Sequence, residues 1–184
     1  MTPTVVGIDT SLTGTGIASS NGWCQVVGWT DKKRPITKLP YPERREALHE
    51  VLQAITDTIG RPDLAVIELP ALSRSGGGGH ERGWLWWQVY NHLAAHEVPI
   101  GLMSTNQRML YATGKGAATK NLIVDAVARR WPTWPTNGDD NAADAVVLMA
   151  AGRDWLGHPL ATMPQAHRAA ITKATWPDTH GVAA

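Results

Sequence analysis

Two short apolar runs, each ending in a carboxylate, stand out in the hydrophobic pattern of the chain. Val5–Asp9 (VVGID) and Leu64–Glu68 (LAVIE) contain no polar side chain before the terminal acid. Continuous apolar runs of this length are typical of strands buried in a mixed or parallel sheet. If these two strands lie side by side and parallel, Asp9 and Glu68 emerge at the same edge of the sheet.

A hairpin is predicted directly after the first of these strands. Residues 10–16 read as a turn and residues 17–20 as a strand, and Asn21-Gly22 is a strong hairpin signal before a returning strand at 23–29. The chain is therefore expected to open with three consecutive strands, the second and third antiparallel.

Helical and strand patterns alternate along the rest of the chain. Residues 43–59 carry apolar side chains at helical spacing, and Gly60 ends that pattern. After the Leu64–Glu68 strand, the pattern predicts a helix at about 83–96, a strand at 100–103, helices at 117–130 and 140–152, and a short helix at about 165–174. We expect one domain over residues 1–152. Residues 153–184 are expected to form a C-terminal tail with a short helix, which either covers a sheet edge or lacks fixed structure. A DNA contact through His167, Arg168 and Lys173 is a further alternative for this tail.

A third group of acids lies far downstream, at the start of the predicted 140–152 helix. Asp140 and Asp144 are four residues apart, so a helix presents both on one face. Laid against the sheet edge, this helix completes a pocket of four carboxylates with Asp9 and Glu68. Such a pocket repels itself unless cations neutralise it, and oxygen-only ligands favour Mg²⁺ or Mn²⁺. Two such ions are the usual clamp for phosphodiester hydrolysis.

Composition and charge narrow the class of protein. The chain has 184 residues, a formal net charge of +1 and one cysteine, so the overall charge does not identify a nucleic-acid binder and no internal disulfide forms. Basic residues cluster locally around 32–45 and 115–130, which suits a polyanionic partner, although two solvated faces would look the same. No apolar stretch reaches the ~20 residues that span a bilayer, and there is no room for a signal peptide. We expect a soluble cytoplasmic protein.

The order of strands and helices, with carboxylates on the first strand, the fourth strand and the last core helix, predicts an α/β fold of the RNase H-like kind, with a mixed five-stranded sheet flanked by helices. At these residues the chain resembles Holliday-junction resolvases of the RuvC type, from a phage or an actinobacterium. Four segments carry the resemblance: GIDTSLTGTG at 7–16, VIE at 66–68, GKGAATKNLIVDAV at 114–127 and NAADAVVLMAAG at 141–152. Such proteins are homodimers that use Mg²⁺ to nick two strands of a four-way junction symmetrically.

The resemblance implies that Asp9, Glu68 and Asp144 are metal ligands. The family usually has an acid or histidine three positions before the last Asp, where this chain has Asn141. We expect Asp140 to supply the missing carboxylate, with an oxygen of Asn141 as a possible substitute. Capping of the helix is the alternative role for Asp140 and the favoured one for Asp139. These ligands would hold two Mg²⁺ ions per active site, with Mn²⁺ as a substitute, and hydrolysis would leave 5′-phosphate and 3′-hydroxyl ends.

Basic side chains near these acids are candidates for DNA contacts. Lys120 matches the family's lysine in the A-x-K segment and is expected at the scissile phosphate, so we count it with the catalytic residues. For the two lysines and Arg108 the alternative is an ordinary surface position. For the glycine-rich loop at 73–80 and the residues beside it, the alternative is a tolerated flexible insertion. The predicted DNA-binding residues are Lys115, Lys120, Arg108, Arg74, His80 and Arg82.

The helix predicted at 83–96 has more apolar surface than one buried face needs, so we expect it to pack on its symmetry mate in a homodimer. Three other functions stay open. A less selective flap or branched-DNA endonuclease is the nearest, and a junction-binding protein without activity is the second. The third is an ATPase of the actin-like kind, which DTSLTGTG resembles, although 184 residues leave no space for its second domain. Any helicase partner is not identifiable.

Overall fold

A five-stranded mixed sheet forms the centre of the molecule. The computed structural model describes residues 2–70 and 78–178. The strands are β1 (Val5–Asp9), β2 (Thr15–Ser19), β3 (Trp23–Val27), β4 (Leu64–Glu68) and β5 (Ile100–Met103), and their order in the sheet is β3-β2-β1-β4-β5. β1 is antiparallel to β2 and parallel to β4, and β4 is parallel to β5. The predicted mixed five-stranded sheet is confirmed.

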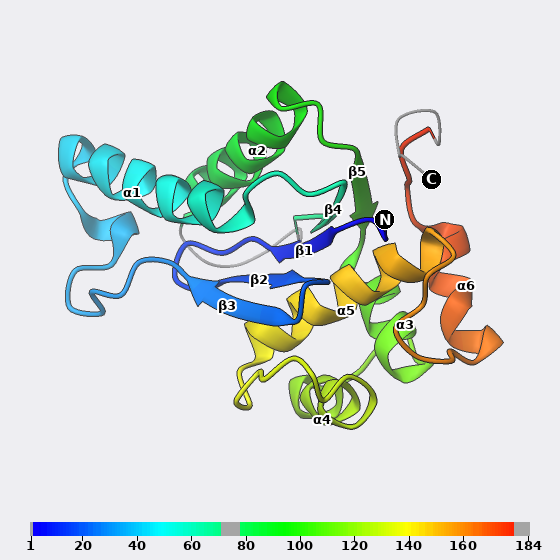
Figure 1. Cartoon of the computed structure of the whole chain (residues 1–184). Coiled ribbons are helices and arrows are strands. Elements are labelled where there is room, and N and C mark those ends of the chain that lie inside the picture. The colour runs from blue at the N-terminus through cyan, green and yellow to red at the C-terminus, as the bar shows by residue number, and fades with distance from the viewer. Residues whose placement is uncertain (1, 71–77, 179–184) are drawn as a thin grey trace.

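Helices cover both faces of this sheet (Figure 1). α1 and α2 lie over one face, and α5 lies across the other, with α3 and α4 beside it and α6 next to α3. The helices are α1 (Tyr41–Ile59), α2 (Gly79–Ala95), α3 (Thr105–Thr113), α4 (Lys120–Arg130), α5 (Asp140–Trp155) and α6 (Gln165–Lys173), with a short 3₁₀ turn η1 (Ile36–Lys38) before α1. No helix in the described ranges is long and apolar enough to cross a membrane.

Alternation of side chains along the strands divides the interior into two cores. In β1, Val6 and Ile8 belong to the core beneath α1 and α2, whereas Val5 belongs to the core beneath α5. The α5 core is the more enclosed of the two, because α5 is buried along nearly its whole length between the sheet and α3 and α4. A helix buried on all sides is apolar all round, which explains the apolar run from Ala145 to Gly152.

Two glycines allow α5 to approach the sheet closely. A Cβ atom on Gly7 of β1 would stand 2.2 Å from the backbone oxygen of Ala145, and one on Gly16 of β2 would stand 2.0 Å from that of Asn141. No side chain fits at such a distance, so the helix lies directly on the backbone of β1 and β2. This contact places the first turns of α5 at the end of β1 where Asp9 lies.

The structure differs from the sequence prediction mainly in one helix. The segment between β5 and α4 contains α3, which the periodicity did not predict because its apolar stripe is short. A signal for it was present: the Ser104 hydroxyl accepts from the backbone N–H of Gln107 at 3.3 Å, and the Gln107 side chain accepts from the N–H of Ser104 at 2.6 Å. This capping box is readable in the sequence as S-x-x-Q.

The C-terminal segment packs against the domain. α5 continues to Trp155, three residues beyond the predicted boundary, and α6 packs on α3. Thr175 then pairs with Leu102 of the edge strand β5 through two backbone hydrogen bonds, of 2.7 and 3.0 Å. At Thr175 the tail therefore lies against the edge strand β5, in agreement with the predicted cover over a sheet edge.

Candidate active site

Two carboxylates meet at the carboxyl edge of the central strands. Asp9 ends β1 and Glu68 ends β4, and the parallel register places Ile8 opposite Ile67, directly before the two acids. The two side chains therefore lie at one edge, as predicted. Burial, and next the negative charge of Glu68, raise the pKa of Asp9 to about 7. The folded protein therefore holds the proton of the Asp9 carboxyl more tightly than an exposed aspartate would.

α5 brings the other two carboxylates to the same edge. Asp139 is the N-cap of α5, since its side chain accepts from the backbone N–H of Ala142 at 3.0 Å, and its predicted capping role is confirmed. Asp140 lies in the first turn, and its charge is among those that raise the pKa of Asp9. Asp144 follows one turn later and is only 7% exposed. The helix thus presents both acids toward Asp9 and Glu68.

A buried arginine lies between two of these acids. The guanidinium of Arg108, on α3, forms ion pairs with both Glu68 and Asp144, and the residue is 5% exposed. Glu68 is held further by the Thr105 hydroxyl, which donates to its carboxylate at 2.6 Å, and its backbone oxygen accepts from the indole of Trp86 at 2.8 Å. The sequence predicted Arg108 as a DNA contact; its observed partners are carboxylates, and the DNA contact stays a prediction.

A lysine supplies the second positive charge. Lys120, the first residue of α4, forms an ion pair with Asp140, and its hydrogen bond is the main cause that lowers the pKa of that carboxyl. Its side chain is 76% exposed, so the ammonium group also faces solvent. A cation at this position can contact an anionic substrate that approaches the carboxylates. The structure therefore brings Lys120 to the acids, as the sequence motif predicts.

The chemistry of these donors fits a hard divalent cation. All four side chains offer carboxylate oxygens, the ligands that Mg²⁺ and Mn²⁺ prefer. Burial and the charge of Glu68 raise the pKa of Asp9 although Arg108 and Lys120 oppose this, so a bound cation would favour the ionised carboxylate. Within residues 2–70 and 78–178, however, no three Asp, Glu, His or Cys side chains are grouped closely enough to hold an ion as they stand. Because Arg108 pairs with Glu68 and Asp144, its guanidinium must move or share these oxygens before an ion binds there.

The remaining predicted site residues lie around this edge in different ways. Asn141 packs its amide nitrogen 2.9 Å from where a Cβ on Gly14 would stand, at the β1–β2 turn, and its possible role as a ligand stays a prediction. His80 and Arg82 are in the first turn of α2. Lys115 is exposed in the loop between α3 and α4. Arg74 lies outside the described residues.

Two solved structures share this architecture. RuvC of T. thermophilus in complex with a Holliday junction substrate is 19% identical, with a TM-score of 0.57 over 88% of this chain and 99% of RuvC. The structure of Thermus thermophilus RuvC is 18% identical, with a TM-score of 0.58 over 94% of this chain and 99% of RuvC. No protein-family model and no curated sequence matches the chain. The chain therefore has the RNase H-like fold of RuvC, as its strand order and motifs predict.

Proposed function

We propose that this chain is a divalent-cation-dependent endonuclease that resolves four-way DNA junctions by paired nicks, leaving 5′-phosphate and 3′-hydroxyl ends. One observation carries the proposal: Asp9, Glu68 and Asp144 converge at one sheet edge, in a fold shared with a protein solved on a Holliday junction. Carboxylates on two strand ends and a crossing helix are a donor set for metal-assisted phosphodiester hydrolysis.

The residues have distinct roles in this proposal. Asp9, Glu68, Asp140 and Asp144 would hold Mg²⁺ or Mn²⁺, which when bound supplies an activated water and stabilises the departing 3′ oxygen. Lys120 pairs with Asp140 and remains largely exposed, so it can hold a substrate phosphate beside the acids. Thr105 orients Glu68 through a hydrogen bond of 2.6 Å. Arg108 keeps Glu68 and Asp144 together while no metal is bound.

Symmetric nicking requires two active sites, and α2 is the surface that we propose for a homodimer. Leu85, Val89 and Leu93 of this helix are buried in the core, whereas Trp87 is 57% exposed and stands against Trp86 and Tyr90. A large exposed indole on a helix that already buries its apolar face is typical of an interface anchor. This dimer would present two copies of the carboxylate edge to one branched DNA.

Cleavage of three labelled substrates tests the function: an immobile four-way junction, a 5′-flap and a linear duplex of the same sequence, each with Mg²⁺ or with EDTA. Paired symmetric nicks in the junction alone, lost in EDTA and in Asp144→Asn, are the expected result. Equal cutting of the flap would instead show a general branched-DNA endonuclease. A circular dichroism spectrum must show that the Asp144→Asn protein is folded.

The position of Arg108 favours one alternative, a junction-binding protein without activity. An arginine that neutralises Glu68 and Asp144 permanently would keep metal out of the site while the fold still recognises DNA. In that case the protein would bind the junction tightly and cut nothing in Mg²⁺ or Mn²⁺. Metal titration of the wild-type protein separates the two functions, because a binding protein of this kind needs no metal.

A further inference from the structure

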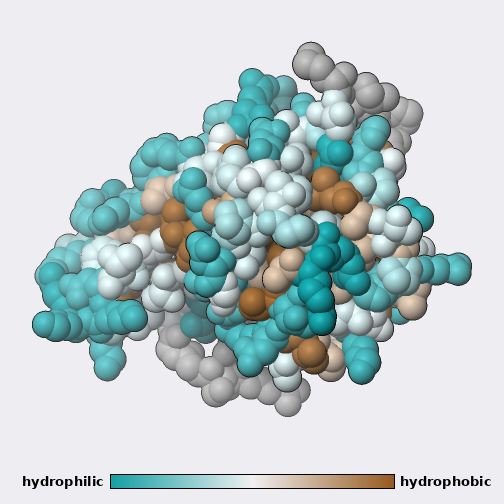
Figure 2. Space-filling view, turned by 60° about the horizontal axis from the view of Figure 1, so that its bottom comes forward, coloured by the Kyte–Doolittle hydropathy of each residue, from teal (hydrophilic) through white to brown (hydrophobic). Residues whose placement is uncertain are grey.

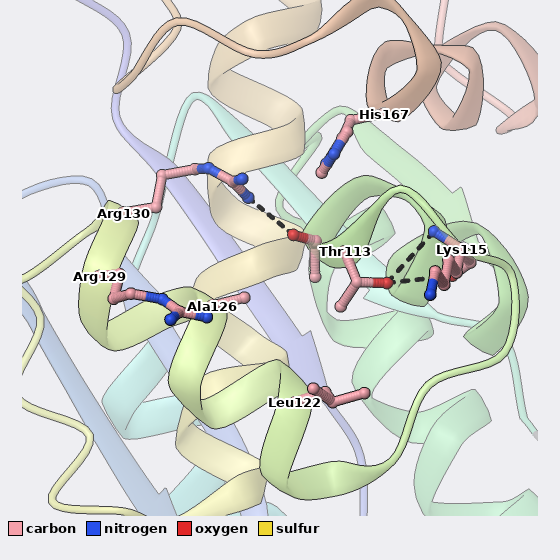
Figure 3. A pocket seen from close by; sticks show the side chains of 8 residues that line it. Thr113, Lys115, Leu122, Ala126, Arg129, Arg130 and His167 are labelled. Carbon is pink, nitrogen blue, oxygen red and sulfur yellow. Dashed lines mark hydrogen bonds between the residues drawn. The ribbon is translucent and has the colours of Figure 1, made fainter.

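A basic cavity lies apart from the carboxylate edge, where three helices meet. Its volume is about 510 Å³, and its walls come from the end of α3, from one side of α4 and from α6 (Figure 3). Leu122 and Ala126 of α4 form an apolar wall. Four basic or titratable side chains complete the lining: Lys115, Arg129, Arg130 and His167. None of the described residues that line the cavity is acidic, so its ligand should be an anion.

Two of these side chains are held in place by the protein. Arg130 donates to the backbone oxygen of Ala112 at 2.7 Å, and its guanidinium lies 5.5 Å from the centre of the Trp131 ring. His167 has its Nδ1 atom 2.9 Å from the backbone oxygen of Tyr111, and because a carbonyl only accepts, that nitrogen carries the hydrogen. Figure 3 shows both side chains extending toward the middle of the cavity. They are therefore ordered before any ligand binds.

The other two side chains remain available to a ligand. Arg129 pairs with Asp125 on the surface, where the two side chains are 74% and 49% exposed. Such an ion pair contributes little to stability, so Arg129 can exchange it for a ligand. Lys115 is exposed, and the Thr113 hydroxyl accepts from its backbone N–H at 3.2 Å, which fixes the loop and leaves the ammonium free to reach a ligand. Two ordered and two adaptable basic groups around one hollow suit a phosphate, which accepts several charge-assisted hydrogen bonds.

A structural explanation accounts for only part of this cluster. Arg129 and Arg130 form the last turn of α4, where cations stabilise the negative end of the helix dipole. That reason does not apply to Lys115, which comes from a loop. The bond from His167 to the Tyr111 oxygen holds α6 on α3, but it uses only one of the two ring nitrogens. On the face turned toward the viewer in Figure 2, hydrophilic side chains surround small apolar patches. A ligand explains why three segments bring basic groups together.

α4 connects this cavity to the carboxylate edge. Lys120, which pairs with Asp140, begins the helix, and Arg130 ends it. Eleven residues of α-helix span about 15 Å, and a DNA duplex carries a phosphate charge about every 1.7 Å of its axis. We propose that this cavity is a second phosphate site, which binds the phosphodiester backbone of the same DNA arm whose scissile phosphate lies at Lys120. The inference rests on the proposed function, and it gives the tail a role through His167.

A matched pair of double variants tests this site. Lys115→Gln with Arg129→Gln removes two positive charges from exposed side chains of the cavity. The control, Arg34→Gln with Arg45→Gln, also removes two charges, from side chains 57% and 68% exposed, in the segment around α1 on the other face of the sheet. Binding of a fluorescent four-way junction in EDTA, between 50 and 200 mM salt, is measured for both and for wild type. Thermal unfolding checks that all three proteins are folded.

The cavity variant should weaken binding by roughly tenfold or more near 0.1 M salt and lower the magnitude of the salt slope by about 2. The control should stay within about twofold of wild type. Equal losses in both variants would show that the cavity and the 32–45 cluster contribute alike to DNA binding, and would overturn the cavity as a distinct phosphate site. Equal junction binding by the wild-type protein and the cavity variant would also overturn the phosphate site. That result would leave the proposed function unaffected. Wild-type protein that binds no junction would overturn both.

Inorganic phosphate and a mononucleotide distinguish the two possible sources of the phosphate. If the cavity binds DNA backbone, millimolar phosphate should raise the thermal stability of wild type only slightly, and the junction should compete with it. A mononucleotide that binds wild type but not the cavity variant, together with unchanged junction binding, would instead assign the cavity to a small phosphorylated molecule. That outcome would overturn the DNA assignment.

Discussion

The guanidinium of Arg108 forms a buried ion pair with the carboxylate of Asp144, 36 positions away in the sequence. The same guanidinium pairs with Glu68, so one cation from α3 neutralises an acid on β4 and an acid on α5. Two carboxylates at low exposure need such a charge, because desolvation penalises an unpaired ion strongly. A metal ion at this edge and Arg108 therefore compete for the same oxygens.

Replacement of Arg108 should make the thermal stability of the protein more dependent on divalent cations. Arg108→Gln removes one partner of a buried ion pair, which typically costs about 3–5 kcal/mol, or very roughly 6–20 °C in Tm for a chain of this size. Mn²⁺ or Mg²⁺ should raise the Tm of Arg108→Gln by more than it raises the Tm of the wild-type protein, because the cation replaces the missing guanidinium. Thermal unfolding in EDTA and in each metal measures the difference.

Arg108→Lys is the control, since it keeps the charge but cannot bridge two carboxylates with one planar group. If Arg108→Gln does not fold in EDTA, calorimetric titration of Mn²⁺ into Arg108→Lys provides the same comparison. Equal metal affinity in the Lys variant and wild type, with equal gains in Tm, would show that Arg108 does not compete with the metal.

Asp9 should make the metal-free protein less stable as the pH rises. Its pKa is raised from 3.8 to about 7 in the folded state, so the folded protein binds this proton more tightly than the unfolded chain. The corresponding stability is fully present below about pH 4 and is lost as the pH rises through about 7. Asp9→Asn has no such proton, and its free energy of unfolding should fall less between pH 5 and 8.

Urea unfolding in EDTA at several pH values measures this effect. The difference between the two proteins isolates Asp9, since the other titrating groups are shared. Curves of unfolding free energy against pH that run parallel for wild type and Asp9→Asn would contradict the prediction.

Gly16→Ala should disturb the contact between α5 and the sheet. The added Cβ would stand 2.0 Å from the backbone oxygen of Asn141, so α5 must shift, and overpacking of this kind costs about 1–3 kcal/mol or more. Because Asp140 and Asp144 move with the helix, cleavage should also fall. Chemical denaturation and the junction assay measure the two effects.

Gly83→Ala is the matched control for this substitution. Gly83 lies within α2, and a Cβ there meets nothing within 4 Å. Alanine in a helix interior is favoured over glycine by about 1 kcal/mol, so this variant should be as stable as wild type or slightly more stable. Equal stability of the two alanine variants would show that α5 can retreat from β2 without cost.

Trp87→Glu should weaken the proposed homodimer. The indole is 57% exposed in the monomer, and a buried interface tryptophan typically contributes at least about 2 kcal/mol, which corresponds to a more than tenfold change in the dimer dissociation constant. Light scattering after size-exclusion chromatography measures the mass at several concentrations. Tyr41→Glu is the control, since Tyr41 is 81% exposed on α1. Dimers of equal strength in both variants would place the interface elsewhere.

Much of the fold follows from local patterns in the chain. The apolar runs before Asp9 and Glu68 become the central parallel pair β1 and β4, and the Asn21-Gly22 turn joins β2 to β3. The spacing of Asp140 and Asp144 on one helix also appears in the structure. These features are local because strand and helix periods, turns and caps depend on residues a few positions apart.

The partners of the charged groups depend on the tertiary structure. Arg108 looked like a surface cation, and only the packing of α3 against α5 brings it between Glu68 and Asp144. His167 reaches the basic cavity for the same kind of reason, because α6 folds back onto α3. The physical reason is that a sequence pattern records which side of an element is buried. Which acids Arg108 meets is decided by contacts between segments 36 and 40 positions apart, and His167 bonds to a carbonyl 56 positions away.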